Sequence, residues 1–305
     1  MAEVEHRWID LIDPTAEKLK THLADRLHPT ALELLLAPLE HDDEPRPRIE
    51  SHGDYIVGVL LVAVAVPSED RVYYQEVDFI LTEERFITVS KTPPGEHPFD
   101  PKPAKELCKD DEPIGMYLYR LFDEVAERYL DLVDDLNDEI DELEDAVEVW
   151  PAAKIRDRIS SLRHDLLHIR RTLAPTRDAA RTIMDDRVEL DGAEIFPREV
   201  DLHFADAYDK LLRASDGLEI SRDLVSGVRD YFQSKIANDQ NEVMKRLTAI
   251  ASILLVPTFI VGLYGQNFLH HFPELHWRYG YLWSWALIIS TTIVQFMWFR
   301  RRRWI

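Results

Sequence analysis

Polar side chains recur at heptad-like intervals along an otherwise apolar stretch near the C-terminal end of the chain. They are Asn241, Thr248, Thr258 and the final Gly265, Gln266 and Asn267 of the segment NEVMKRLTAIASILLVPTFIVGLYGQN. Amide and hydroxyl oxygens are neutral acceptors, and they suit a cation that keeps its waters, as Mg2+ does. The spacing therefore predicts a pore-lining face, with Asn267 at the mouth as its leading candidate.

Apolar residues on the same stretch could close such a path. Met244, Leu247 and Leu255 fall at helical spacing and could form constrictions that exclude water. Leu and Met at this spacing are more often ordinary packing residues, so both interpretations stand. Thr258 could likewise bond back to a backbone carbonyl, and Gly265 could serve only a helix cap and a turn.

A second motif could bind a metal. The run His164-Asp165-Leu166-Leu167-His168 has the histidine spacing of a zinc-protease helix, with Asp in place of the Glu base. Two histidines at i and i+4 share a helix face and could hold zinc. No third ligand can be assigned from the sequence, and the surrounding residues are rich in Arg. Exposed histidines on a helix are the favoured interpretation, and we expect no enzyme.

The composition allows one or two soluble domains and a short membrane part within 305 residues. The formal net charge of −21 argues against nucleic acid as a partner, because phosphate binding needs clustered basic side chains. Cys108 is the only cysteine, so no intramolecular disulfide is possible. The N-terminal residues MAEVEHRWIDL have no apolar stretch, and no cleavable signal is expected.

Two uncharged runs, 247–264 and 279–299, predict membrane spans. At about 1.5 Å of rise per residue, a helix over the first run nearly crosses a hydrocarbon layer of roughly 30 Å, and a helix over the second run crosses it. Basic residues flank the outer ends of both runs, at Lys245-Arg246 and at 300–303. We therefore expect a multi-pass protein of the cytoplasmic (inner) membrane, with both termini in the cytoplasm. Because two helices cannot enclose a pore, several copies would have to gather around an axis.

The pattern predicts an α+β membrane protein whose stalk helix continues into the first span. We expect a cytoplasmic α/β domain over 1–112, an acidic and basic helical hairpin over 113–190, the stalk helix and first span over 196–264, an extracytoplasmic loop over 265–278, the second span over 279–299 and a basic cytoplasmic tail over 300–305. The hairpin should have complementary charged flanks, and salt-bridged, solvated faces are favoured there over a metal-attracting acidic tip.

The chain resembles the CorA family of divalent-cation channels. The resemblance rests on Asn241-Glu242-Val243-Met244-Lys245, Pro-Thr-Phe-Ile at 257–260, Tyr264-Gly265-Gln266-Asn267-Phe268, Pro273-Glu274-Leu275 and a basic C-terminus ending Trp304-Ile305. It implies a funnel-shaped homopentamer in the lipid bilayer that takes up Mg2+, often also Co2+ or Ni2+. Mg2+ would be both the transported ion and a possible regulator, with no other cofactor.

The resemblance also implies roles for single residues. Asn267 would bind hydrated ion at the outer mouth, Asn241 would lie at the inner mouth, and the three apolar positions named above would be gates. In the family a carboxylate pair between subunits binds cytoplasmic Mg2+ and holds the pore shut. Asp206 matches one partner of that pair, whereas the other position is Leu34.

Three departures from the family pattern leave alternatives open. The signature Gly-Met-Asn is Gly-Gln-Asn here, and Gln266 adds an amide at the mouth. Leu34 cannot bind Mg2+, so feedback should be weaker unless Glu33 or the cluster at 42–44 substitutes. The loop carries His270, His271 and His276. A ZntB-like zinc transporter is therefore an alternative, and a membrane-anchored scaffold or zinc hydrolase is a second.

Overall fold

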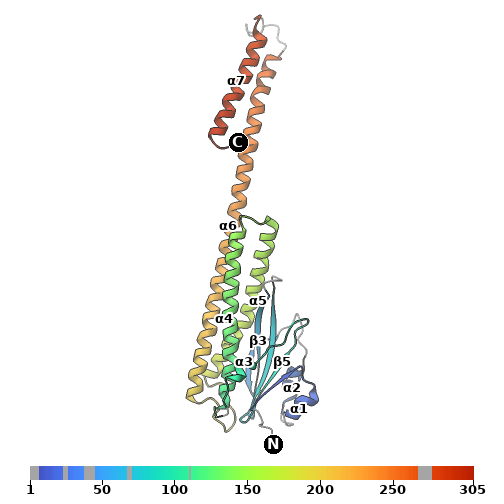
Figure 1. The fold of residues 1–305 in the computed structure, drawn as a ribbon, viewed down its shortest axis with the longest axis vertical. Coiled ribbons are helices and arrows are strands. Elements are labelled where there is room, and N and C mark those ends of the chain that lie inside the picture. The colour runs from blue at the N-terminus through green and yellow to red at the C-terminus, as the bar shows by residue number, and fades with distance from the viewer. Residues whose placement is uncertain (1–6, 23–26, 38–44, 67–70, 110, 267–276) are drawn as a thin grey trace. The chain divides into compact units, whose positions relative to one another are not determined.

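The computed structural model describes residues 7–22, 27–37, 45–66, 71–109, 111–266 and 277–305. The chain divides into two compact units, 1–228 and 229–305. The first unit contains a sheet with helices, and the second contains the two candidate membrane helices (Figure 1). The long helix α6, Arg198–Tyr264, has residues in both units.

The sheet of the first unit has five strands in the order β1-β5-β4-β3-β2. They are β1 (Trp8–Ile12), β2 (Arg48–Ser51), β3 (Ile56–Val66), β4 (Arg71–Leu81) and β5 (Phe86–Lys91). β1 is parallel to β5, and the other neighbours are antiparallel. The Val-rich run of β3 has a strand on each side and helices over it, which explains why it shows no polar alternation.

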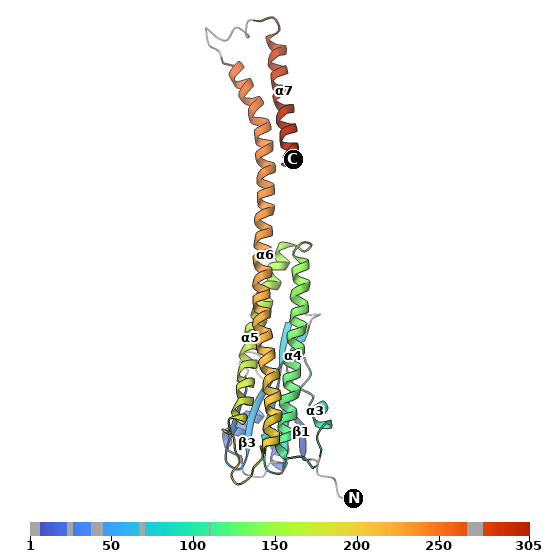
Figure 2. The same cartoon turned by 90° about the vertical axis from the view of Figure 1, so that its left-hand side faces the viewer.

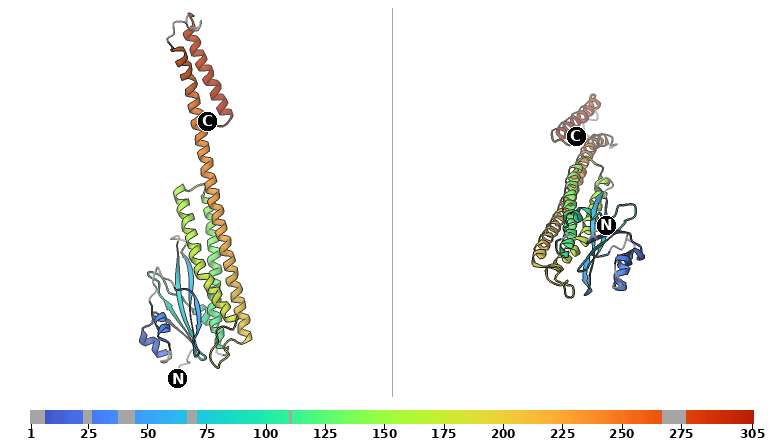
Figure 3. Two further views of the ribbon diagram at one scale, coloured as in Figure 1. Left: turned by 180° about the vertical axis from the view of Figure 1, so that it is seen from behind. Right: turned by 60° about the horizontal axis from the view of Figure 1, so that its bottom comes forward.

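Helices cover both faces of this sheet (Figures 1 and 3). The short helices α1 (Ala16–His22) and α2 (Pro29–Leu36) lie on one face, where Leu19 and Leu35 pack with Ile80 and Val89. The helices α4 (Ile114–Ala146) and α5 (Ala152–Met184) lie on the other, and α3 (Lys102–Glu106) precedes them. The Tyr129 hydroxyl on α4 donates to the Leu61 carbonyl of β3 at 2.7 Å and lies 2.9 Å from the Thr172 hydroxyl of α5.

Aromatic rings continue the core from the sheet through α4 to α6. The ring centroids of Phe79 and Phe122 are 6.3 Å apart, and those of Phe122 and Phe204 are 5.6 Å apart. All three rings are fully buried. Further along, the Ser221 hydroxyl of α6 donates to Asn137 of α4 at 2.7 Å. The N-terminal half of α6 therefore packs along α4, and the two helices run in the same direction.

The second unit consists of the end of α6 and the helix α7, Gly280–Arg301, which runs alongside it (Figure 2). Both helices are long and apolar enough to cross a membrane. In the most apolar 18-residue segment of each helix, the chain buries only 11% of the residues of α6 and 6% of those of α7. Their remaining apolar surface is available to lipid or to other copies of the chain.

Candidate functional site

The polar positions predicted for the pore lie on one face of α6. At about 100° of rotation per residue, Asn241, Met244, Leu255 and Thr258 fall within an arc of roughly 100°. Leu247 and Gly265 lie at the edge of this arc. We call it the stripe. It also contains Thr248 and two small residues, Ala251 and Gly262. These two were not predicted from the sequence, although they continue the same heptad spacing.

The stripe is exposed in the single chain. Met244 and Leu247 are each 58% exposed and Leu255 is 67% exposed. Two residues of this helix segment are buried, Ala249 and Ile260, and helical geometry places them roughly opposite the stripe. The face of α6 that the chain covers is thus not the face that carries the polar residues.

The end of α6 shows which local bonds its polar residues already make. The Thr258 hydroxyl donates to the Leu254 carbonyl at 2.7 Å, so its proton is used within the helix while its oxygen remains exposed. The Gly265 amide donates to the Val261 carbonyl at 2.9 Å, and Gly265 does not take the left-handed conformation of a common glycine cap. Gln266 follows and is exposed. Asn267 and the three loop histidines lie outside the described residues.

Asp206 is an exposed carboxylate on α6 in the first unit. It lines an open pocket with Tyr119, Asp209, Lys210 and Arg213. Lys210 does not pair with it, because its ammonium group lies 2.6 Å from Asp123 and 2.5 Å from Glu127 of α4. Burial would lower the pKa of Lys210, but these hydrogen bonds and charges outweigh it and raise the pKa. Among the described residues Asp206 forms no ion pair, so its carboxylate is open to an external cation.

Leu34, at the position where the family pattern has a carboxylate, is turned to the core. Its side chain packs against the apolar cluster between α1, α2 and the sheet. Its carbonyl accepts a hydrogen bond of 2.8 Å from Lys91, whose ammonium group also lies 2.5 Å from Glu76 and 3.0 Å from Asp78. The adjacent Glu33 is exposed, and the cluster at 42–44 lies outside the described residues.

The buried group Lys91, Glu76 and Asp78 was missed by sequence reasoning. All three side chains are at most 6% exposed. Burial, and next the charge of Glu76, raises the pKa of Asp78 well above its ordinary value. Strand alternation alone would have marked 76 and 78 as facing the same side, but nothing local placed Lys91 opposite them. This group fastens the end of α2 to the sheet.

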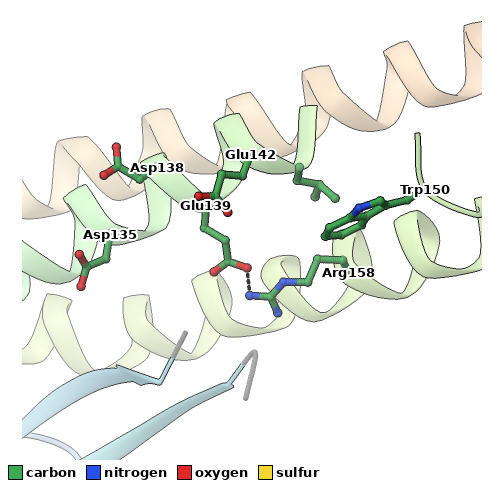
Figure 4. Close-up of a pocket in the computed structure, with 7 residues that line it drawn as sticks. Asp135, Asp138, Glu139, Glu142, Trp150 and Arg158 are labelled. Carbon is green, nitrogen blue, oxygen red and sulfur yellow. Dashed lines mark ion pairs between the residues drawn. The ribbon is translucent and has the colours of Figure 1, made fainter. Parts of the chain in front are cut away.

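The acidic helix α4 borders a pocket near the tip of the hairpin (Figure 4). Glu139 forms an ion pair with Arg158 of α5, which is nearly buried between the two helices. Asp135, Asp138 and Glu142 form no ion pair among the described residues. Complementary charged flanks stay a prediction from the sequence, and the Glu139–Arg158 pair joins the two helices at this point. Apolar packing holds the hairpin, and most of its charges face solvent.

The two histidines of α5 are brought together. The ring centroids of His164 and His168 are 4.2 Å apart. Within the described part of the chain no group of three or more His, Cys, Asp or Glu residues could hold a metal, so the zinc-protease interpretation gains no third ligand.

Comparison with known proteins gives one consistent family. The sequence model of the CorA-like Mg2+ transporter protein family matches residues 3–301. The cobalt/magnesium transport protein CorA of Thermotoga maritima is 30% identical over 285 residues, covering 92% of this chain and 77% of that protein. The putative metal ion transporter YfjQ of Bacillus subtilis is 30% identical over 305 residues, covering 97% and 89%.

Solved structures agree in fold. The complete CorA magnesium transporter of Methanocaldococcus jannaschii superposes with a TM-score of 0.77 at 23% identity, covering 100% of this chain and 94% of that one. The ZntB cytoplasmic domain of Vibrio parahaemolyticus is a more distant likeness, with a TM-score of 0.55 at 14% identity over 76% of this chain and 88% of that one.

Proposed function

This chain belongs to the CorA-like Mg2+ transporter family, and from that membership we propose that it carries hydrated Mg2+ inward through a pore lined by the stripe of α6. CorA-type transport of Mg2+ or Co2+ is the activity that the family match and the named relatives support. A transporter family also fits the expectation that the chain is not an enzyme.

The observation that carries the proposal is the exposure of the stripe. A helix that buried its polar face against α7 would serve as an anchor, but α6 leaves that face uncovered. In a bilayer an uncovered row of amides, hydroxyls and backbone glycines needs water or protein beside it. Several copies around an axis would supply both, and we propose that they form a homopentamer in the cytoplasmic membrane with both termini inside.

Neutral oxygens set the proposed ion chemistry. Asn267 at the outer mouth and Asn241 at the inner one would accept hydrogen bonds from the waters of the ion rather than replace them. Thr258 would present its oxygen midway, because its hydroxyl proton is already given to Leu254. Met244, Leu247 and Leu255 would close the path by excluding water from a narrow apolar ring.

Flux into liposomes tests the mouth assignment. We expect Asn267→Ala to lower Mg2+ flux by about tenfold or more, since about 1.4 kcal/mol in a barrier changes a rate tenfold and one lost hydrogen bond is worth about that much. Ser284→Ala on α7 is the matched control, because its hydroxyl bonds within its own helix to Tyr281. Unchanged Mg2+ flux in Asn267→Ala would show that Asn267 does not form the mouth.

Comparing Zn2+ flux with Mg2+ flux into the same liposomes distinguishes a zinc transporter from a magnesium transporter. That alternative rests on Gln266, on the loop histidines and on the distant likeness to a ZntB domain. Zn2+ flux without Mg2+ flux would replace the magnesium proposal, whereas Mg2+ flux without Zn2+ flux would remove the zinc one. His270→Ala, His271→Ala and His276→Ala together should leave Mg2+ flux unchanged.

A further inference from the structure

The histidine pair of α5 is left unused by the proposed transport path. His164 and His168 lie one helical turn apart, with ring centroids at 4.2 Å and ring planes inclined by 50°. His164 is exposed and His168 is partly exposed, so both rings are open to solvent. Within the described chain neither ring forms a hydrogen bond to, or an ion pair with, another residue. Their nitrogen lone pairs are therefore available to an external ligand.

We propose that His164 and His168 together bind one borderline transition-metal dication, of the Co2+, Ni2+ or Zn2+ class, with water filling its remaining positions. For metal–nitrogen distances of about 2.0–2.1 Å, the centroids of two neighbouring imidazole ligands lie roughly 4.5–5 Å apart. The observed 4.2 Å needs only a small opening of the two rings to reach this separation. Two histidines at i and i+4 on one helix are a recurrent metal-binding pair.

The helix holds the two rings in place. Leu162, Leu166 and Ile169 on α5 are buried, which fixes the rotation of the helix against its neighbours. Two residues beyond His168, Arg170 forms an ion pair of 2.9 Å with Glu219 of α6. A pair of ligands on such an anchored helix is organised before the metal arrives, so little freedom is lost on binding.

The donor set selects the class of ion. Imidazole nitrogen suits Co2+, Ni2+, Cu2+ and Zn2+, whereas Mg2+ prefers oxygen. The positive charge of Arg171 opposes a dication, whereas Asp165, which follows His164, is an acidic group near the pair. The site thus differs in ligand chemistry from the neutral oxygens of the stripe.

Calorimetric titration of the full-length protein with Ni2+ tests the pair. The protein should carry no polyhistidine tag, the three loop histidines should be replaced by Ala, and excess Mg2+ should occupy the oxygen sites. We expect His164→Ala and His168→Ala each to weaken one Ni2+ site by about tenfold or more, because each removes half of the chelate. His97→Ala, an exposed histidine outside α5, is the control and should leave the titration unchanged.

A second measurement counts the ligands directly. Cu2+ bound to the same protein should show an electron paramagnetic resonance spectrum split by two nitrogens, which changes to one nitrogen in either single variant. Ni2+ binding that neither variant weakens, or that only one of them weakens, would overturn the two-histidine site. Both variants alter solvent-exposed rings, and an unchanged melting temperature would exclude unfolding as the cause. Neither result depends on whether the chain transports Mg2+.

Discussion

Leu34 shows how a single position can separate this chain from the family pattern. The resemblance predicts a carboxylate there, but the side chain packs into the cluster beneath α2 and its carbonyl accepts a hydrogen bond from Lys91. The Leu34 carbonyl and the buried acids Glu76 and Asp78 share the ammonium group of Lys91 as their partner. The apolar side chain fits these surroundings, and Glu33, the neighbouring exposed residue, is the carboxylate that α2 offers instead.

The buried Asp78 predicts a measurable dependence of stability on pH. Its pKa is raised well above 3.8 by burial and then by Glu76, so the folded state holds this proton more tightly than the unfolded state. The unfolding free energy should fall as the pH rises from about 4 through the raised pKa. Asp78→Asn removes this titrating group, so the variant should not lose stability in this way. The melting temperature of the variant minus that of the parent should therefore increase as the pH rises from about 4.

Thermal unfolding of both proteins at a series of pH values makes the comparison. Glu83→Gln, which changes an exposed carboxylate in the turn between β4 and β5, serves as the control and should track the parent. If the difference in melting temperature between Asp78→Asn and the parent stays constant or declines as the pH rises, the raised pKa of Asp78 is contradicted.

At the scale of elements, two glycines of α6 have different surroundings. A Cβ atom on Gly217 would lie 2.7 Å from the Cγ1 atom of Val133 on α4, so the two helices approach closely there. A Cβ atom on Gly227 would meet nothing within 4 Å. The first glycine is required by packing between helices, whereas the second only adds freedom to the unfolded chain.

Alanine at these two positions should therefore have opposite effects. We expect Gly217→Ala to destabilise the protein by about 1–3 kcal/mol, because it forces Val133 to move in a packed core. Gly227→Ala should stabilise it by roughly 0.5–1 kcal/mol. Denaturant unfolding measures both. Combining Gly217→Ala with Val133→Ala should recover part of the loss, and strict additivity of the two changes would argue against this contact.

At the scale of the whole molecule, the functional unit we propose is larger than one chain. The stripe is exposed on a single α6, and Asp206 is an exposed carboxylate that forms no ion pair among the described residues. Both features lie on the same helix, the first near its end and the second near its start. In the proposed assembly, α6 is the element that connects Asp206 with the stripe.

Closure by Mg2+ should be weak in such an assembly. A site with one carboxylate, Asp206, holds the ion less firmly than a pair would, so protection from limited proteolysis should require more Mg2+ than a paired site needs. Asp206→Ala should therefore change the protection curve only slightly, by about threefold or less in midpoint, which is below 1 kcal/mol. Asp216→Ala, an exposed carboxylate of α6 outside this pocket, is the control. Tight protection that disappears in Asp206→Ala would show that a second carboxylate completes the site.

The sequence by itself determined the two candidate spans, the long helix that contains the first of them and the family. Hydropathy and helical spacing are local properties, so 247–264 and the heptad positions from Asn241 to Thr258 can be identified without any tertiary contact. The prediction of a continuous helix from about 196 to 264 agrees with α6 at Arg198–Tyr264 for the same reason. Motifs such as Asn241-Glu242-Val243-Met244 carry the resemblance to the CorA family, and the match of the family model over residues 3–301 shows that family.

The tertiary structure decided which residues meet. Lys91, Glu76 and Asp78 gather because β4 and β5 pair in one particular register, and no pattern within either strand contains that information. The two helices of the hairpin are joined by the Glu139–Arg158 ion pair and by buried apolar residues, and most of their other charged side chains face water. The uncovered face of α6 likewise depends on where α7 packs. Contacts between distant segments depend on the packed fold as a whole, which local sequence patterns do not specify.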